Sequence, residues 1–303
     1  ATNTSSLSVT AIAAACQHPE RVVGFHFFNP VPLMKIVEVI PGLRTADTVT
    51  QRVNALGTAM GHFTAQATDT PGFLVNHAGR AFGTEALRIL SESVADPATI
   101  DRIMVDQGGF RMGPFTLLDL TGLDVSHAVM ESVYHQYYEE PRFRPSPLTR
   151  QRLSAGLLGR KTGEGFYRYV DGQQQMPEEP AIAPASPCPV WISQDDPGSA
   201  AQLAELVTTA GWPLESTDQP SSAALCLLTP LGEDTTQCAL RQGLNAEQCV
   251  AVDMLAGLDK RRSLMASPIT RPDLINAAAS LLNADGTPVS TLQDSTGFVL
   301  QRV

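Results

Sequence analysis

The sequence predicts an α/β chain with an all-α region in its middle, and the changing spacing of its apolar residues is the reason. In the first part, β-branched and aromatic residues alternate with a period of two, which is typical of strands. We expect strands at 21–28, 35–40 and 62–68 and a helix at 47–60. Strands and helices that follow one another in this way indicate an α/β sheet.

The spacing becomes helical from residue 69 onward. The stretch DTPG (69–72) is a typical helix start, with Thr70 as N-cap and Pro71 at the first helical position, where its missing N–H costs nothing. One buried stripe is expected along this helix, at Leu74, Ala78, Phe82, Ala86 and Leu90. Further helices are expected from Asp96 to Gly108, from Gly113, along Val125, Val129, Val133 and Tyr137, and from Ser146 to Gly159.

Strand patterns return after a stretch rich in proline and glutamine, and they repeat part of the first region. Strands are expected at 190–193, 223–228 and 249–255, with a helix at 200–210. DTPGFLVN (69–76) recurs as DSTGFVLQ (294–301), and VGFHF (23–27) has a loose counterpart in VAVDM (250–254). The repeat therefore matches His26 with Asp253 and Asn76 with Gln301. We assign the repeat no chemistry, because no general base survives in it.

These patterns set the expected domain limits. We expect an α/β part at 1–68, a helical domain at 69–172, a linker at 173–189, a second α/β domain at 190–290 and the start of a second helical domain at 291–303.

Composition excludes several classes of function. The formal net charge of −10, from 21 basic and 31 acidic residues, argues against binding to nucleic acid. No apolar run is long enough to span a membrane, and no secretory signal is visible. The five cysteines form no CxxC pair, which predicts reduced thiols in a cytosolic protein and no metal site.

Two ionisable residues interrupt apolar strand patterns. His26 stands within VGFHFF (23–28), and Glu38 stands within KIVEVI (35–40). A carboxylate against one imidazole nitrogen fixes the tautomer of the ring and leaves the other nitrogen free to accept a proton. A core histidine with backbone partners, or an ion pair without a catalytic role, fits the same residues. The pattern alone leaves these readings open.

Five motifs carry a resemblance to a known family: NTSSL (3–7), HFFNPVPLMKIVEVI (26–40), DTPGFLVN (69–76), GPFTLLDLTGLD (113–124) and GRKTGEGFY (159–167). In this order they resemble the L-3-hydroxyacyl-CoA dehydrogenase family, the NAD-dependent step of β-oxidation, over residues 1–169. The long form, with a linker and a reduced second half, resembles the duplicated bacterial 3-hydroxybutyryl-CoA dehydrogenases, including those of phenylacetate catabolism. The resemblance implies the C-terminal part of a Rossmann NAD-binding domain, a helical dehydrogenase domain and a reduced Rossmann-like domain.

The resemblance also implies roles for single residues. His26 would be the general base that takes the 3-hydroxyl proton, and Glu38 would orient and charge-stabilise it. Ser5 and Asn76 would hydrogen-bond the substrate oxygens. Three positions match the cofactor-contacting residues of the family: Ser5, Asn29 and Lys161. The implied protein is a cytoplasmic enzyme that uses NAD and an acyl-CoA substrate and forms a homodimer through its helical domain.

Other interpretations remain for these residues and for the protein. Ser5 could cap the following helix, Asn76 could be a buried polar residue bonded to a neighbouring helix, and Lys161 could neutralise carbonyls at a helix end. The protein could also be a non-catalytic assembly module, or a dehydrogenase of hydroxy acids that carry no CoA.

The cofactor site departs from the family pattern. NAD domains of this family use a GxGxxG turn and a helix N-terminus for the pyrophosphate, and no GxGxxG occurs in these 303 residues. The strand PVWIS (189–193) is followed by QDDPGS (194–199), which is acidic where a phosphate would sit. We therefore expect a fragment that by itself binds NAD poorly and turns over little.

Overall fold

The computed structural model describes residues 1–28 and 31–303. The chain divides into two compact units: unit 1 contains residues 1–84 and 121–158, and unit 2 contains residues 85–120 and 159–303. These limits cut the chain differently from the domain limits expected above, which remain predictions.

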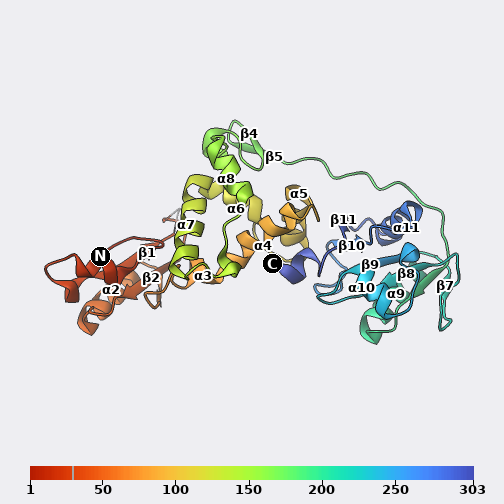
Figure 1. Ribbon diagram of the computed structural model, residues 1–303, viewed down its shortest axis with the longest axis horizontal. Helices are drawn as coiled ribbons and strands as arrows, with labels where there is room; N and C mark the ends of the chain where they lie inside the picture. Colours follow the sequence, from red (N-terminus) through yellow and green to blue (C-terminus); the bar gives the residue numbers. More distant parts are fainter. Residues whose placement is uncertain (29–30) are drawn as a thin grey trace. The chain divides into compact units, whose positions relative to one another are not determined.

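Unit 1 contains a three-stranded sheet of the order β1-β2-β3 (Figure 1). The strands are β1 (Val23–Phe27), β2 (Ile36–Pro41) and β3 (Phe63–Gln66). The pair β1–β2 is antiparallel and the pair β2–β3 is parallel. Helix α2 (Asp47–Ala59) joins β2 to β3, and its Val49 and Val53 pack on the apolar face of the sheet. The expected strands and helix are thus confirmed, with ends shifted by a few residues.

The helix expected from Pro71 is interrupted. The chain forms α3 (Val75–Ala78) and α4 (Arg80–Ser91), and Thr70 caps neither. Leu74 is 49% exposed, so the predicted stripe is wrong at its start. The reason is a tight turn before α3, in which Gly72 has φ +80° and Phe73 has φ +49°.

The elements of residues 92–167 are helices: α5 (Pro97–Arg102), a π-helical turn η2 (Ile103–Gln107), α6 (Pro114–Thr121), α7 (Leu123–Gln136), η3 (Pro141–Phe143), α8 (Pro147–Ser154) and η4 (Arg160–Thr162). Asp96 and Ser146 cap α5 and α8 as N-cap residues. The stripe predicted along α7 is wrong at Val125, which is exposed, and confirmed at Val133, which is buried; α7 also buries Leu123, His127 and Met130.

The first residues of the expected linker form a hairpin. Strand β5 (Gln173–Gln175) pairs with β4 (Arg168–Val170), and regular structure is absent only from residues 176–189, which run as an extended segment in Figure 1. The expected linker therefore contains regular structure in its first residues, and its limits remain a prediction.

Unit 2 contains a six-stranded sheet of the order β11-β10-β9-β8-β6-β7. Its strands are β6 (Val190–Ile192), β7 (Leu214–Glu215), β8 (Leu225–Leu228), β9 (Cys249–Val252), β10 (Arg262–Ala266) and β11 (Val289–Gln293). Its helices are α9 (Pro197–Thr209), α10 (Thr235–Arg241), η5 (Ala246–Gln248), α11 (Pro272–Leu282) and α12 (Val299–Arg302). Helices α9 and α11 bury Leu203, Val207 and Leu274 in one core with the strands. This is a Rossmann-like sheet with its helices.

The strand register confirms the internal repeat. In unit 1, Thr2 bridges Gly24 of β1 in parallel, and β1–β2–β3 continues as one antiparallel and one parallel pair. In unit 2, Leu228 of β8 pairs with Ala251 of β9 in parallel, and β9–β10–β11 continues in the same way. The His26–Glu38 pair of β1 and β2 thereby corresponds to Asp253 and Ser263, whose backbones are hydrogen-bonded at 3.0 Å.

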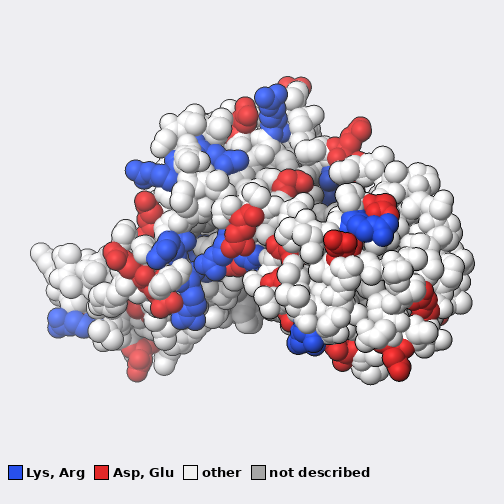
Figure 2. Space-filling view, turned by 45° about the vertical axis from the view of Figure 1, so that its right-hand side comes forward, with Lys and Arg blue, Asp and Glu red and all other residues white. Residues whose placement is uncertain are grey.

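The surface charges, the helices and the cysteines add one observation each. Figure 2 shows acidic and basic side chains interspersed on the face that it draws. None of the helices formed by the described residues combines the length and apolar character that crossing a bilayer requires. All five cysteines are free thiols, as expected.

Candidate active site

A buried histidine–carboxylate couple lies on the β1–β2 pair. His26 and Glu38 are register partners on adjacent antiparallel strands, so their side chains leave the sheet on the same face. The Nδ1 atom of His26 lies 2.6 Å from Oε2 of Glu38. His26 is 3% exposed and Glu38 is fully buried. The structure therefore brings together the two residues that the sequence pattern singled out.

Glu38 is held by the turn before α3 as well as by His26. Its Oε1 accepts hydrogen bonds from the backbone N–H groups of Leu74 (2.9 Å) and Val75 (2.8 Å). Burial alone would raise the pKa of Glu38, but the hydrogen bonds from His26, Val75 and Leu74 outweigh it and hold the pKa below its ordinary value. The side chain is therefore a carboxylate that can stabilise positive charge on the imidazole ring.

The backbone strain of Phe73 explains how these N–H groups reach Glu38. A left-handed φ of +49° is costly for a residue with a bulky side chain. Phe73 is buried, and its ring centroid lies 5.8 Å from that of His26. The turn thus aims two N–H groups at Glu38 while the ring packs beside His26. Sequence reasoning treated DTPGF as a plain helix start and missed this role.

Ser5 and Asn76 lie on the other side of the imidazole ring. Nε2 of His26 is 3.1 Å from the Ser5 hydroxyl, and the Asn76 amide donates to the Ser5 carbonyl at 3.3 Å. The N-cap of α1 (Val9–Ala14) is Ser8, so the capping interpretation of Ser5 is wrong. The partner of Asn76 lies in the Ser5 loop and not on a neighbouring helix. Three predicted site residues, His26, Ser5 and Asn76, therefore form one hydrogen-bonded series.

Asn29 and Lys161 are the two other predicted cofactor residues. Asn29 lies outside the described residues. Lys161 is an exposed residue of η4 in unit 2, within the GRKTGEGFY motif. That motif is built around the buried carboxylate of Asp119, which accepts from the N–H groups of Phe166 (2.8 Å) and Tyr167 (2.9 Å). A side chain at Gly159, where φ is +110°, would meet the Asp119 backbone at 2.3 Å.

The GPFT motif has an equivalent structural basis. The buried carboxylate of Asp101 accepts from the N–H groups of Phe115 and Thr116, both at 2.9 Å, at the start of α6. A Cβ on Gly113 would lie 2.2 Å from Asp101. Both motifs therefore specify local folding, whatever else they contact.

The repeat places different groups at the position equivalent to His26. Asp253 is fully buried, and its carboxyl accepts from the amides of Gln301 (2.9 Å) and Gln107 (3.3 Å). The oxygen of the Gln107 amide in turn accepts from Ser263 at 2.8 Å. Burial raises the pKa of Asp253 despite these hydrogen bonds. All these side chains satisfy one another, and none has an unshared nitrogen that could take a proton.

The phosphate position of the repeat is also occupied by the chain itself. Asp196, the N-cap of α9, accepts from the N–H of Gly198 (3.1 Å) and the hydroxyl of Ser199 (2.5 Å). A carboxylate therefore sits at the helix N-terminus that would receive a pyrophosphate.

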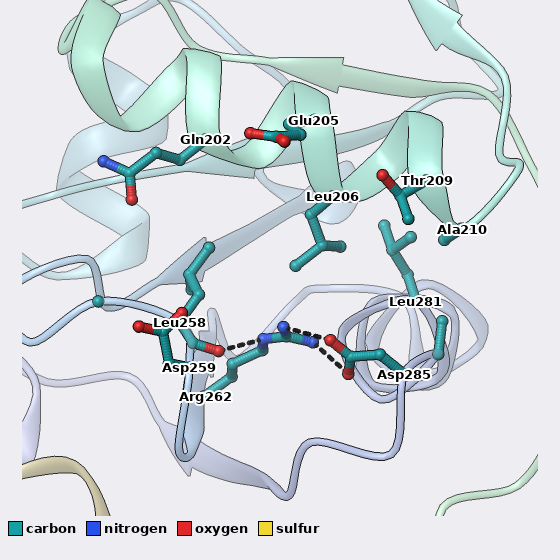
Figure 3. Close-up of a pocket in the computed structure, with 12 residues that line it drawn as sticks. Gln202, Glu205, Leu206, Thr209, Ala210, Leu258, Asp259, Arg262, Leu281 and Asp285 are labelled. Carbon is teal, nitrogen blue, oxygen red and sulfur yellow. Dashed lines mark hydrogen bonds and ion pairs between the residues drawn. The ribbon is translucent and has the colours of Figure 1, made fainter.

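A cavity of about 390 Å³ lies elsewhere in unit 2, between α9 and α11 (Figure 3). Its Arg262 pairs with Asp285 and donates to the Leu258 carbonyl, so this guanidinium is already partnered. Within residues 1–28 and 31–303, no group of three His, Cys, Asp or Glu side chains is arranged to hold a metal ion.

The histidine couple lies on the sheet of unit 1, and comparison with known proteins identifies the family of the chain. Residues 1–70 match the NAD binding domain of 3-hydroxyacyl-CoA dehydrogenase, and residues 72–169 match the C-terminal domain of the same enzyme. Together the two models cover more than half of the chain. The chain belongs to the 3-hydroxyacyl-CoA dehydrogenase family.

Individual relatives agree with this family. The chain is 34% identical to the 3-hydroxyadipyl-CoA dehydrogenase of Escherichia coli over 99% of its own length and 58% of that protein. It is 46% identical to a probable 3-hydroxybutyryl-CoA dehydrogenase of Deinococcus radiodurans, over 56% of the chain and 60% of that protein. The chain thus spans little more than half the length of these relatives.

Solved structures show where the likeness extends. A 3-hydroxybutyryl-CoA dehydrogenase structure from Escherichia coli matches 99% of this chain and 58% of its own, with a TM-score of 0.76 and 33% identity. An (S)-3-hydroxybutyryl-CoA dehydrogenase from Ralstonia eutropha matches 56% of this chain and 59% of its own, with a TM-score of 0.54 and 43% identity. The first of these matches includes the repeat.

Proposed function

We propose that the chain is the catalytic part of an NAD-dependent dehydrogenase that oxidises L-3-hydroxyacyl-CoA to 3-oxoacyl-CoA. The observation that carries this proposal is the buried His26–Glu38 couple, whose second imidazole nitrogen points at Ser5. Family membership supports it, and so do relatives named for 3-hydroxyadipyl-CoA and 3-hydroxybutyryl-CoA.

The proposed mechanism uses His26 as the general base. With Nδ1 bound to the Glu38 carboxylate, Nε2 is the nitrogen that accepts the proton of the 3-hydroxyl group as C3 is oxidised. Glu38 then stabilises the imidazolium ion. Ser5 and Asn76 hydrogen-bond the substrate oxygens and orient C3. General-base assistance of this kind contributes roughly 10²–10⁴ in rate.

Bound NAD would supply the acceptor for the hydride that leaves C3. The chain's own residues fit its nicotinamide end, because Ser5 lies beside the imidazole nitrogen that takes the proton; Asn29 and Lys161 are proposed as further contacts. The pyrophosphate end has no GxGxxG turn in these residues, and the equivalent helix end in the repeat is closed by Asp196. We therefore propose that the chain alone binds NAD weakly and turns over little.

Two satisfied carboxyl groups in the second half of the chain support a structural role for this half. Asp253 and Asp196 are satisfied by the chain's own groups at the two positions where catalysis and phosphate binding would occur. We propose that residues 190–303 serve as a non-catalytic assembly module. A cytoplasmic homodimer through the helical domain is part of the same proposal and rests on the family resemblance.

The variant His26→Gln tests the proposed function in the protein expressed from its complete gene. We expect reduction of acetoacetyl-CoA by NADH to fall by roughly 10²–10⁴ while the thermal unfolding curve is retained. Unchanged reduction would leave only the assembly role. Equal activity on free acetoacetate would show that the substrate is a hydroxy acid without CoA. Micromolar binding of NADH to residues 1–303 alone would contradict the proposed weak binding.

A further inference from the structure

The loop that carries Ser5 has no regular structure of its own. Residues 4–7, the Ser5 loop, belong to neither a helix nor a strand, so the backbone N–H and C=O groups of this loop need other partners. The Thr4 hydroxyl oxygen accepts from the N–H of Leu7 at 2.9 Å and from that of Ser6 at 3.4 Å. These hydrogen bonds hold one side of the peptide groups that follow Ser5. The position of the Ser5 side chain therefore also depends on what holds the carbonyl side.

Two side-chain amides from helices hold this carbonyl side. Asn76 of α3 donates to the Ser5 carbonyl at 3.3 Å, and Gln136, the last residue of α7, donates to the Ser6 carbonyl at 2.6 Å. The peptide group between residues 6 and 7 is thus bound on both sides by short hydrogen bonds. The peptide group between residues 5 and 6 has only contacts longer than the usual range of about 2.7–3.2 Å. Gln136 therefore provides the firmer of the two helix contacts.

Gln136 is itself fixed on its helix. Its amide nitrogen also donates to the hydroxyl oxygen of Ser132, one turn earlier on α7, at 2.9 Å. The next residue, Tyr137, contacts α3, because its hydroxyl oxygen lies 3.1 Å from Nδ1 of His77. All these groups belong to unit 1. The end of α7 therefore holds the Ser5 loop while it is itself bound to α3.

The repeat holds its equivalent loop in a different way. Gln301, the counterpart of Asn76, donates to the Pro230 carbonyl at 3.3 Å and accepts from the N–H of Gly232 at 2.9 Å. One side chain thus binds both a carbonyl and an N–H group of that loop. In the first copy α7 takes part as well, and this is the copy in which a serine hydroxyl faces the imidazole ring of His26. The contact from α7 therefore accompanies the hydroxyl group that has a proposed role.

We infer that Gln136 is a positioning residue that acts through Ser5. The inference rests on the proposed function, because it assumes that Ser5 hydrogen-bonds the substrate. The Ser5 hydroxyl lies 3.1 Å from Nε2 of His26, so a rotation of the peptide groups that follow Ser5 moves this hydroxyl away from the place of proton transfer. A displacement of about 1 Å can cost roughly 10²-fold in rate. Gln136 opposes this rotation by holding the Ser6 carbonyl.

The test is a double-mutant cycle in the protein expressed from its complete gene. Reduction of acetoacetyl-CoA by NADH is measured for the wild type, Gln136→Leu, Ser5→Ala and the double variant. We expect Gln136→Leu to lower kcat by roughly 10–100-fold with a smaller change in KM, because the Ser5 hydroxyl is displaced. In the Ser5→Ala background the same substitution should change kcat by less than about threefold, because the group through which Gln136 acts is already gone.

Two further variants separate the hydrogen bond from the shape of the side chain. Gln136→Glu keeps the shape but turns an acceptor toward the Ser6 carbonyl, so it should lose at least as much activity as Gln136→Leu. Gln136→Lys keeps an N–H donor and should recover part of the activity. Gln51→Leu is the matched control, because it removes an exposed glutamine from α2 of the same unit, and it should leave kcat unchanged.

Hydrogen exchange of the peptide that contains residues 3–9 reports on the loop directly. Exchange should be faster in Gln136→Leu than in the wild type, while the peptides of β1 and β2 keep their rates. Unchanged exchange, unchanged kcat, or an equal loss of kcat with and without the Ser5 hydroxyl would each overturn the inference. A wild type that reduces no acetoacetyl-CoA would instead refute the proposed function.

Two complications leave the test decisive. If Gln136→Leu fails to fold, Gln136→Glu takes its place in both backgrounds of the cycle. If Ser5→Ala has no measurable turnover, the exchange of the Ser5 loop and the recovery in Gln136→Lys decide. Faster exchange with recovered kcat supports the inference, and the absence of either contradicts it.

Discussion

In unit 1 the strand pair β1–β2 sets His26 beside Glu38, whereas in unit 2 the equivalent pair β9–β10 sets Asp253 beside Ser263. The strand directions and the register are the same in both. Ser5 is replaced by Leu231 in the equivalent loop, and Asn76 by Gln301. The frame of the fold is thus conserved within one chain while the groups that could move a proton are lost.

The backbone conformation before α3 also differs from that before α12, its counterpart in the repeat. Phe73 has φ +49°, but its counterpart Phe298 has φ −71° and is an ordinary extended residue. Only the copy with the histidine couple keeps the strained turn that points two N–H groups at a carboxylate. The comparison teaches that strain persists where it orients a functional group and relaxes where the group is gone.

The largest expected effect comes from removing the charge of Glu38, whose counterpart in the repeat is the uncharged Ser263. In Glu38→Gln the side-chain amide would donate to Nδ1 of His26, which forces the proton onto Nε2 and removes the base. We expect kcat to fall by roughly 10²–10⁴ with little change in KM. Steady-state kinetics of the protein expressed from its complete gene checks this. Asp253→Asn is the control, and a comparable loss there would show that the repeat takes part in catalysis.

The next effect concerns the frame that both copies share. Asp69 accepts from the N–H groups of Val9 (2.7 Å) and Thr10 (2.6 Å), and Asp294 accepts from those of Thr235 (2.8 Å) and Thr236 (3.2 Å). We expect Asp69→Ala and Asp294→Ala to destabilise their own units by about 2–4 kcal/mol each, because helix N–H groups lose a charged acceptor. Hydrogen exchange resolved by peptide measures each unit. Asp→Asn variants at both positions should lose less, and equal exchange in all variants would contradict a shared frame.

A smaller effect is a difference between the two copies in how their stability depends on pH. Hydrogen bonds hold the pKa of Glu38 below its ordinary value despite burial, so its contribution to stability is present above the ordinary pKa and is lost as the pH falls through the lowered one. Burial raises the pKa of Asp253, so its contribution is present below the ordinary pKa and is lost as the pH rises through the raised one.

Asp253→Asn should therefore stabilise unit 2 more at pH 8 than at pH 5, since the amide cannot ionise and Gln107 can turn its own amide to match. Denaturant unfolding followed by the fluorescence of Trp191 and Trp212, both in unit 2, measures the difference. A stabilisation that is the same at both pH values would contradict the raised pKa.

The smallest effect is expected at the start of α9. Asp196→Ala removes a helix cap and should lower the melting temperature of unit 2 slightly. It should not create NADH binding, because no glycine-rich turn precedes the helix. Titration of the variant with NADH checks this. A gain in affinity would show that the carboxylate of Asp196 alone separates the repeat from a working cofactor site.

The sequence by itself determined the parts that depend on local patterns. Period-two alternation located β1, β2 and β3, and the repeated DTPGF-type motif located the second copy. The N-caps Asp96 and Ser146, each followed by proline, located α5 and α8. The sequence also singled out His26 and Glu38, because each residue interrupts an apolar strand face, and it left their pairing open. These features arise from interactions between residues close in sequence or in adjacent strands.

Only the tertiary structure decided the rest. The strain of Phe73 and the hydrogen bonds that Glu38 accepts from the N–H groups of Leu74 and Val75 depend on groups far apart in the chain. The helical stripes failed at Leu74 and Val125 for the same reason, since the packing of other segments chooses which face of a short helix is buried. A local pattern specifies the backbone of an element, but burial and electrostatics are properties of everything that surrounds it.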